Sequence, residues 1–197
     1  MKQPLSKIIK LAKKIKDIKF FLPKSINKGT TGILFEELAG IKKSSDCLDC
    51  EDGEIKTYPL KIINTKNKIN DKRKYIPTET IAITMIDKNK ILNEEWKESR
   101  LYKKIKNILF IGYEREDNYI IFKRIQLMNE NEKRHKELYK IFENDYNLIQ
   151  KSYQENNVNG SIGKLIQSRT KGKGGKAKKT RAFYFRPFLM DKLDNIK

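Results

Sequence analysis

The 197-residue sequence predicts a single mixed α/β domain, in which a central mixed sheet is flanked by helices. Three observations favour this class. Short apolar or alternating segments typical of strands are interspersed with segments of helical periodicity. Apolar residues make up 38% of the chain, enough for a substantial core. The sequence shows neither internal repeats nor an obvious linker.

Five segments have the pattern of helices. The first is basic and amphipathic and ends at Pro23, the second closes at Gly40, and the last begins at Pro187. We expect the first helix to pack its apolar side against the core, with a membrane-surface role as the alternative. The expected helices cover residues 6–23, 33–40, 93–107, 129–153 and 187–196.

Six segments have the pattern of strands, and turn residues separate them. Residues 115–118 predict a hairpin between the third and fourth strands. The Asp52-Gly53 dipeptide predicts a two-residue hairpin turn that pairs residues 46–51 with the first strand. The expected strands cover residues 54–63, 80–86, 108–114, 118–127, 163–169 and 181–186.

The charge balance indicates a polyanionic partner. Lys and Arg number 44 against 25 Asp and Glu, a net charge of +19. Abundant Lys, Ile and Asn also fit a compositional bias, so charge alone does not decide the function. Nothing in the sequence suggests secretion, and we expect a cytoplasmic protein.

The two cysteines, Cys47 and Cys50, argue against zinc and redox chemistry. A structural zinc site needs four ligands, and the single histidine, His135, lies far along the chain. Neighbouring carboxylates raise the pKa of a thiol, which is the reverse of what a redox cysteine needs. We therefore expect two small residues on a strand.

A cluster of carboxylates is unexpected in so basic a chain. In the predicted hairpin, cross-strand neighbours share a face, so Asp49, Glu54 and Lys56 project to one side. Carboxylate oxygens are the ligands that Mg²⁺ prefers, and a nearby lysine could orient a bound water. The alternative is a solvated acidic hairpin. The cluster consists of Asp46, Asp49, Glu51, Asp52 and Glu54.

Five ordered motifs resemble the MutH-type endonucleases and the related GATC-cutting type II restriction enzymes. The resemblance covers residues 29–194 and implies a restriction-endonuclease-like core whose two lobes form a cleft for duplex DNA. The motifs are "TTGILFEELAG", "GEIKTYPLK", "ETIAITM", "KKIKNILFI" and "GKLIQSRTKG" followed by "TRAFYFRPFL".

The resemblance implies roles for individual residues. Glu36, Asp49 and Glu54 are expected to be catalytic carboxylates and metal ligands. Lys56 is expected to act on the attacking water, and Lys104 to support the phosphate or the nucleophile. The expected DNA-binding residues are Arg169, Lys171, Lys173, Arg181 and Tyr184, of which Tyr184 occupies the position that senses adenine methylation.

One departure concerns the aspartate. The family's spacing would place it at Cys47, which cannot replace a hard oxygen ligand. We choose Asp49 because the hairpin puts it on the face of Glu54, and because its distance from Glu36 along the chain fits the family better. Asp46 is the fallback.

The expected activity is Mg²⁺-dependent cleavage of duplex DNA at GATC-like sites, sensitive to adenine methylation, with Mn²⁺ able to substitute. We favour a restriction enzyme that forms a homodimer on DNA and has a cognate adenine methyltransferase as its genetic partner. The alternatives are a mismatch-repair nickase and a catalytically inactive DNA-binding relative. No stable membrane association is expected. In this scheme, residues 1–28 form a helical arm, 29–128 a catalytic lobe and 129–197 a DNA-reading lobe.

Overall fold

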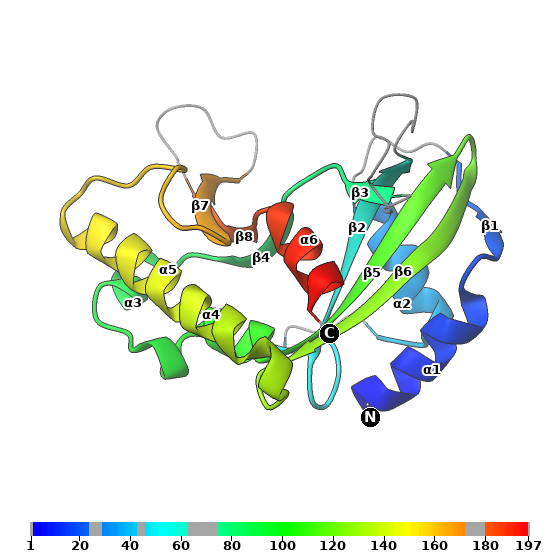
Figure 1. Cartoon of the computed structure of the whole chain (residues 1–197), viewed down its shortest axis with the longest axis horizontal. Coiled ribbons are helices and arrows are strands. Elements are labelled where there is room, and N and C mark those ends of the chain that lie inside the picture. The colour runs from blue at the N-terminus through cyan, green and yellow to red at the C-terminus, as the bar shows by residue number, and fades with distance from the viewer. Residues whose placement is uncertain (1, 24–28, 43–45, 63–74, 172–179, 197) are drawn as a thin grey trace. The chain divides into compact units, whose positions relative to one another are not determined.

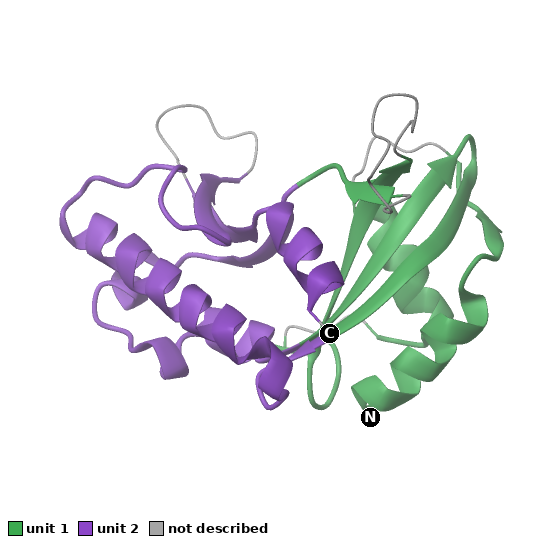
Figure 2. Cartoon of the chain, viewed as in Figure 1, with its two compact units in different colours: residues 1–79, 108–127 green, residues 80–107, 128–197 purple. Residues whose placement is uncertain are grey.

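The computed structural model describes residues 2–23, 29–42, 46–62, 75–171 and 180–196. It confirms the mixed α/β class, with helices and strands interspersed along the chain. The contacts group the chain into two compact units, residues 1–79 with 108–127 and residues 80–107 with 128–197 (Figure 2). This grouping follows the sheets and differs from the expected sequential arm and lobes.

The first unit is built on a five-stranded mixed sheet in the order β1-β6-β5-β2-β3 (Figure 1). The strand β2 runs parallel to β5, so that Glu54 lies opposite Ile108. Strands β1 and β3 pair antiparallel with β6 and β2, respectively. The strand bounds are β1 Lys19–Phe21, β2 Glu54–Ile62, β3 Tyr75–Pro77, β5 Asn107–Glu116 and β6 Tyr119–Asn129.

Helices α1 (Leu5–Ile15) and α2 (Thr30–Leu38) cover one face of this sheet. The expected first helix is too long, because Asp17 adopts a positive φ of 65° and the next residues form β1. Pairing of β1 with β6 depends on a strand a hundred residues away, which local periodicity does not show. The shared core consists of Leu5, Ile8, Ala12, Ile15, Phe35, Ala39, Cys50, Ile55, Leu109, Ile111, Ile120 and Phe122.

The second unit has a three-stranded antiparallel sheet in the order β4-β8-β7, with bounds Ile81–Met85, Arg181–Phe185 and Ile166–Thr170. Helix α5 (Lys136–Gln154) packs on one face through ring contacts, Phe142 to Phe185 at 5.7 Å and Tyr146 to Phe183 at 6.0 Å between centroids. The unit also contains α3 Lys88–Ile91, η2 Trp96–Glu98, α4 Arg100–Ile105, η3 Lys133–His135 and α6 Phe188–Asn195.

The helix expected over residues 93–107 is interrupted. Ser99 has an extended backbone between η2 and α4, and its hydroxyl accepts a hydrogen bond from the Tyr102 amide at 3.0 Å. This is helix N-capping, and it starts a new helix where periodicity alone predicted a continuous one. No described helix has the length and apolar character needed to cross a membrane.

Candidate active site

The acidic segment at residues 46–53 is a loop, and the predicted hairpin is wrong. A turn does form, since the Cys50 amide donates to the Gly53 carbonyl at 2.9 Å. The described residues before it, 46–51, form no strand, and β2 pairs with β5 and β3 instead. Cys47 and Cys50 therefore lie in a loop and not on the expected strand.

Two of the clustered carboxylates serve the start of α1. The Asp52 carboxylate accepts a hydrogen bond from the Leu5 amide at 2.7 Å. Asp46 forms an ion pair with the Lys2 ammonium at 3.1 Å. The first amides of a helix lack intrahelical partners and carry partial positive charge, so a carboxylate there is stabilising. Part of the acidic cluster thus has a structural cause, and Asp46 is engaged elsewhere.

Glu54 and Lys56 lie two positions apart on β2 and share a face of the sheet. The Lys56 ammonium contacts the Glu54 carboxylate at 2.5 Å, with side chains 20% and 1% exposed, respectively. Burial strengthens the Coulomb attraction within such a pair but also costs desolvation, and loss of one partner leaves a buried charge without compensation. Asp49 reaches the same strand from the loop, where its carboxylate accepts the Ile55 amide at 3.0 Å.

The carboxylates near the start of β2 could bind a hard cation such as Mg²⁺, but only with two acidic ligands from the protein. In the described part of the chain, no three acidic, Cys or His side chains are grouped so that they could hold a metal ion, so Glu36, Asp49 and Glu54 do not form a ready three-acid site. Mg²⁺ often uses only one or two carboxylates, completed by water and substrate phosphates. Asp49 in the loop and Glu54 at the start of β2, both with oxygen ligands, are the residues that would hold it.

Two other expected catalytic residues lie on helices. Glu36 is half-buried on α2, which packs against β2 closely enough that a Cβ on Gly32 would lie 3.3 Å from the Thr57 hydroxyl. Thr57 alternates with Lys56 and belongs to the other face of the strand. Lys104 is a buried residue in the last turn of α4, in the second unit. Its role beside the phosphate stays a prediction.

Two residues that continue the Lys56 face across the sheet were not predicted from the sequence. Tyr58 is next on that face and 1% exposed, and its hydroxyl donates to the Gln126 side chain on β6 at 3.1 Å. Gly112 on β5 allows this reach, because a Cβ there would lie 3.0 Å from the Tyr58 ring. Alternation along β2 could have identified Tyr58, but Gln126 required the strand order.

The surroundings of Cys50 act on its thiol in the direction that the sequence predicts. Its side chain is fully buried, and burial together with Asp49, Asp52 and Glu54 raises the pKa of its thiol to about 12. Both cysteines are free thiols. A thiol held in this way does not supply the thiolate that redox or metal chemistry needs.

The expected DNA-reading residues lie around β7 and β8. Arg169 is exposed, its guanidinium donates to the Thr80 hydroxyl at 2.9 Å, and it lies 5.9 Å from the centre of the Tyr184 ring. Gln167 pairs with Tyr184 across the strands, which places Arg169 and Tyr184 diagonally on one face. The face opposite packs on α5, as the ring contact of Phe185 with Phe142 shows.

The three remaining residues predicted to contact DNA differ in their surroundings. Lys171 is exposed at the end of β7, where its amide donates to the Thr180 carbonyl. Arg181 donates twice to Ser168, once to its hydroxyl and once to its carbonyl, both at 2.7 Å, and so ties β8 to β7. Lys173 lies outside the described residues.

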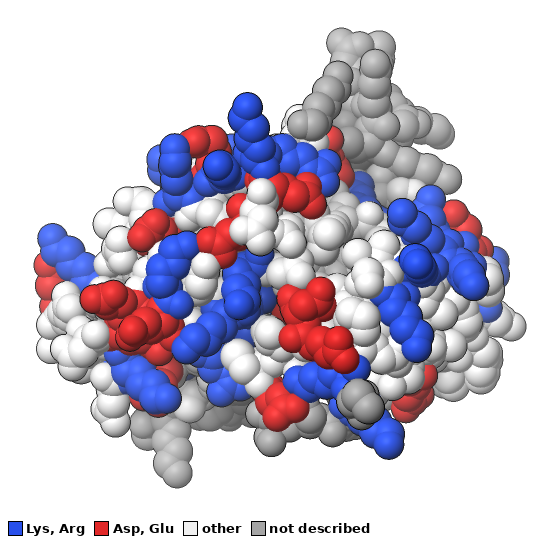
Figure 3. All heavy atoms as spheres, turned by 90° about the horizontal axis from the view of Figure 1, so that it is seen from below, with Lys and Arg blue, Asp and Glu red and all other residues white. Residues whose placement is uncertain are grey.

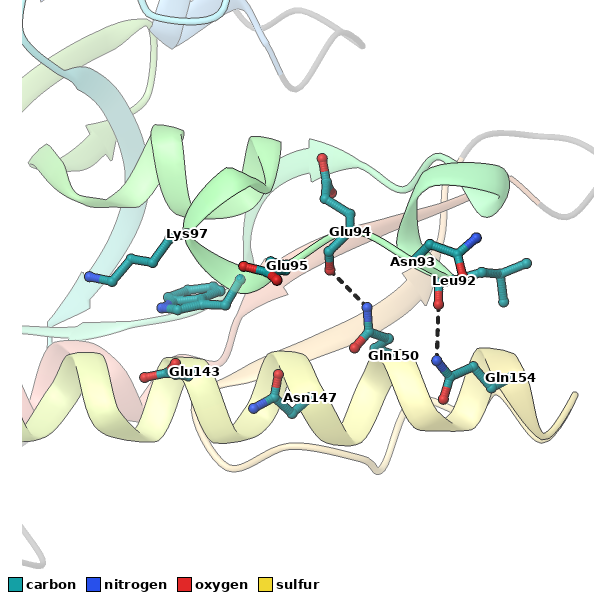
Figure 4. A pocket seen from close by; sticks show the side chains of 10 residues that line it. Leu92, Asn93, Glu94, Glu95, Lys97, Glu143, Asn147, Gln150 and Gln154 are labelled. Carbon is teal, nitrogen blue, oxygen red and sulfur yellow. Dashed lines mark hydrogen bonds between the residues drawn. The ribbon is translucent and has the colours of Figure 1, made fainter.

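A pocket of about 460 Å³ in the second unit contains none of the predicted site residues. Figure 4 shows the side chains of α5 facing the segment at residues 92–97, with Gln150 and Gln154 donating to backbone carbonyls of that segment. Glu94, Glu95 and Glu143 line this pocket, so its charge opposes a phosphate backbone. It is not a candidate for the DNA site.

Comparison with known proteins identifies the class. Residues 35–151, more than half of the chain, match the family model MutH, described as the DNA mismatch repair enzyme MutH. The chain belongs to the MutH family, which confirms the resemblance seen in its motifs. The matched span contains Glu36, Asp49, Glu54, Lys56 and Lys104.

Among solved structures, the restriction endonuclease MvaI in complex with its cognate DNA substrate is similar to this chain. The identity is 15% and the TM-score is 0.43, over 95% of this chain and 93% of that chain. No curated protein sequence gives a significant match.

Proposed function

We propose that this protein is a Mg²⁺-dependent endonuclease that hydrolyses phosphodiester bonds of duplex DNA. The observation that carries the proposal is the Glu54–Lys56 pair at the start of β2, with the Asp49 carboxylate on the adjacent amide. These residues lie within the span that matches the MutH family. Family membership supports a DNA substrate, and the acid–lysine arrangement supports hydrolysis.

In this mechanism, Asp49 and Glu54 would hold the ion, and Lys56 would act at the attacking water or the phosphate. A bound Mg²⁺ supplies a more acidic water and neutralises charge on the phosphate. Lys56 is a point charge on a flexible stem, held beside Glu54 until the substrate arrives. Because the pair is nearly buried, its electrostatic interactions are stronger than they would be in water.

We propose recognition of GATC-like sites through the β7–β8 hairpin, with Arg169 and Lys171 reaching the bases or phosphates. Arg169 is held by Thr80 and lies near Tyr184, so it loses less conformational freedom on binding than a freely rotating side chain. Tyr184 is only half-buried beside it, a position from which it can contact an adenine and its methyl group.

Two versions of the activity differ in how many strands are cut. A restriction enzyme cuts both strands of a palindrome and needs two copies or two binding events, and its genome encodes a matching adenine methyltransferase. A repair nickase cuts one unmethylated strand, and the description of the matching family favours this version. Plasmids that are unmethylated, hemimethylated or fully methylated separate the two. Linear product from unmethylated plasmid, without a partner protein, supports restriction; nicking only of hemimethylated or unmethylated plasmid supports repair.

The rival proposal is an inactive relative that only binds DNA. It predicts no cleavage with Mg²⁺ or Mn²⁺, and duplex binding that is unchanged in Lys56→Ala. The nuclease proposal predicts cleavage by the unaltered protein and its loss in Lys56→Ala with binding retained. A plasmid cleavage assay run beside a gel-shift assay distinguishes the two.

A further inference from the structure

Helix α1 packs its apolar side in the core, but the lysines on its polar side have no role in the fold. Its apolar side is fully used, since Leu5, Ile8 and Ala12 are at most 2% exposed in the core of the first unit. An interfacial membrane helix needs that apolar side for the lipid. The membrane-surface alternative therefore does not fit this helix, and only its polar side is open to a partner.

The polar side of α1 carries positive charge without compensation. The helix contains no acidic residue. Lys7, Lys10, Lys13 and Lys14 are exposed, and within the described ranges none of them forms an ion pair with a carboxylate. Helix α5 differs, because Lys140 pairs with Glu137 and Lys151 with Glu155.

The uncompensated lysines should destabilise helix α1. Like charges three or four positions apart on a helix repel one another, as Lys10 does with Lys7 and Lys14. Lys7 also lies in the first turn, where the helix dipole disfavours a cation. The capping Asp52 and the buried apolar side hold the helix in spite of this repulsion. A bound polyanion would remove it.

We propose that Lys7, Lys10 and Lys14 form a stripe that binds the phosphate backbone of duplex DNA without reading its sequence. At 100° per residue the three side chains fall within one narrow sector, and they span about 10 Å of helix axis. About six phosphates lie along that length of duplex. Lys and Arg side chains gather on the right of Figure 3, where α1 lies in Figure 1. This inference rests on the proposed DNA substrate.

The test compares two triple variants with the same change in net charge. The stripe variant is Lys7→Gln, Lys10→Gln and Lys14→Gln, and the control variant is Lys136→Gln, Lys140→Gln and Lys151→Gln on α5. Binding of a duplex without a recognition site is measured across a salt series. The stripe variant should flatten the dependence of log K on log salt by about 2 to 3 units, since each phosphate contact contributes about 0.9. The control should change it by less than one.

Equal changes in the two variants would overturn the stripe while leaving the proposed nuclease intact, because the unaltered protein still binds DNA. Absence of duplex binding by the unaltered protein would overturn both. Replacing the same three lysines with Arg should leave the slope as in the unaltered protein, because the three positive charges are kept. Binding to vesicles that contain phosphatidylserine is measured as well. The proposal would also be refuted if the stripe variant lost binding to vesicles but kept the salt dependence of DNA binding.

Discussion

Asp52 and Glu54 are two positions apart and have different tasks. Asp52 caps α1, whereas Glu54 is buried on β2 and holds Lys56. The sequence presents both as members of one acidic cluster, because the partner of Asp52 is the Leu5 amide, far away along the chain. Contacts of individual side chains, and not local charge density, separate the helix-capping carboxylate from the one proposed to be catalytic.

Asp52→Ala should destabilise the protein and leave its chemistry unchanged. Loss of the bond to the Leu5 amide exposes an uncapped helix end, which costs about 0.5–2 kcal/mol in the free energy of unfolding. Urea denaturation measures this value. Glu51→Ala is the matched control, an exposed acid in the same loop, and should change stability by less than about 0.5 kcal/mol. An equal effect of both substitutions would argue against the cap.

Cys50 should resist alkylation in the folded protein. The raised pKa of its buried thiol leaves almost no thiolate at pH 8, whereas Cys47 is partly exposed in the same loop. Treatment with iodoacetamide followed by peptide mass spectrometry should show modification of Cys47 alone, and of both cysteines in urea. Rapid labelling of Cys50 in the native state would contradict this placement.

At the scale of elements, strong local patterns predict most helices and strands, although the helix expected over residues 6–23 is shorter and the one over 93–107 is interrupted. The alternation after Gly53 predicts β2, and the long amphipathic pattern predicts α5, as the structure shows. The Asp52-Gly53 signal correctly predicts a turn but not a hairpin. The Glu51 amide donates to the Gln3 carbonyl ahead of α1, and only the Asp49 side chain accepts from β2. The parallel pairing of β2 with β5 joins segments about fifty residues apart, which no local pattern encodes.

A buried acid, Asp145, holds the end of the connection from α5 to β7. The Asp145 carboxylate accepts the amides of Lys164, Leu165 and Ile166 at 2.7–2.8 Å. Gly163 precedes them with a φ of 86°, and a Cβ there would lie 1.9 Å from the Ile166 carbonyl oxygen. The Asp145 carboxylate and the tight turn at Gly163 therefore both fix the backbone ahead of β7. They also fix the start of β7, the strand that carries Arg169.

Asp145→Ala should lower the free energy of unfolding by about 3–5 kcal/mol, because it leaves buried amides without an acceptor. Thermal or urea unfolding measures the change. Asn144→Ala, an exposed neighbour on the same helix, should have little effect. A small loss for Asp145→Ala, similar to that of the control, would mean that water or another group replaces the carboxylate.

At the scale of the whole molecule, net charge and motif order are the informative features of the sequence. The charge of +19 indicates a polyanion, and the ordered motifs identify the MutH family that the comparison confirms. The division into two units was not predictable, because each unit is assembled from separate stretches of the chain. The resemblance implied three metal-binding acids, Glu36, Asp49 and Glu54. The described residues contain no such ready group of three, so the role of these acids as ligands stays a prediction.

The most direct test of the central claim is cleavage of unmethylated supercoiled plasmid by the unaltered protein and by Lys56→Ala, with and without Mg²⁺. We predict cutting that requires Mg²⁺ and falls by at least about a hundredfold in Lys56→Ala, a typical loss for a positioned group in proton transfer, while the affinity for DNA is retained. Cleavage that persists in Lys56→Ala, or duplex binding with no cleavage in Mg²⁺ or Mn²⁺, would contradict it.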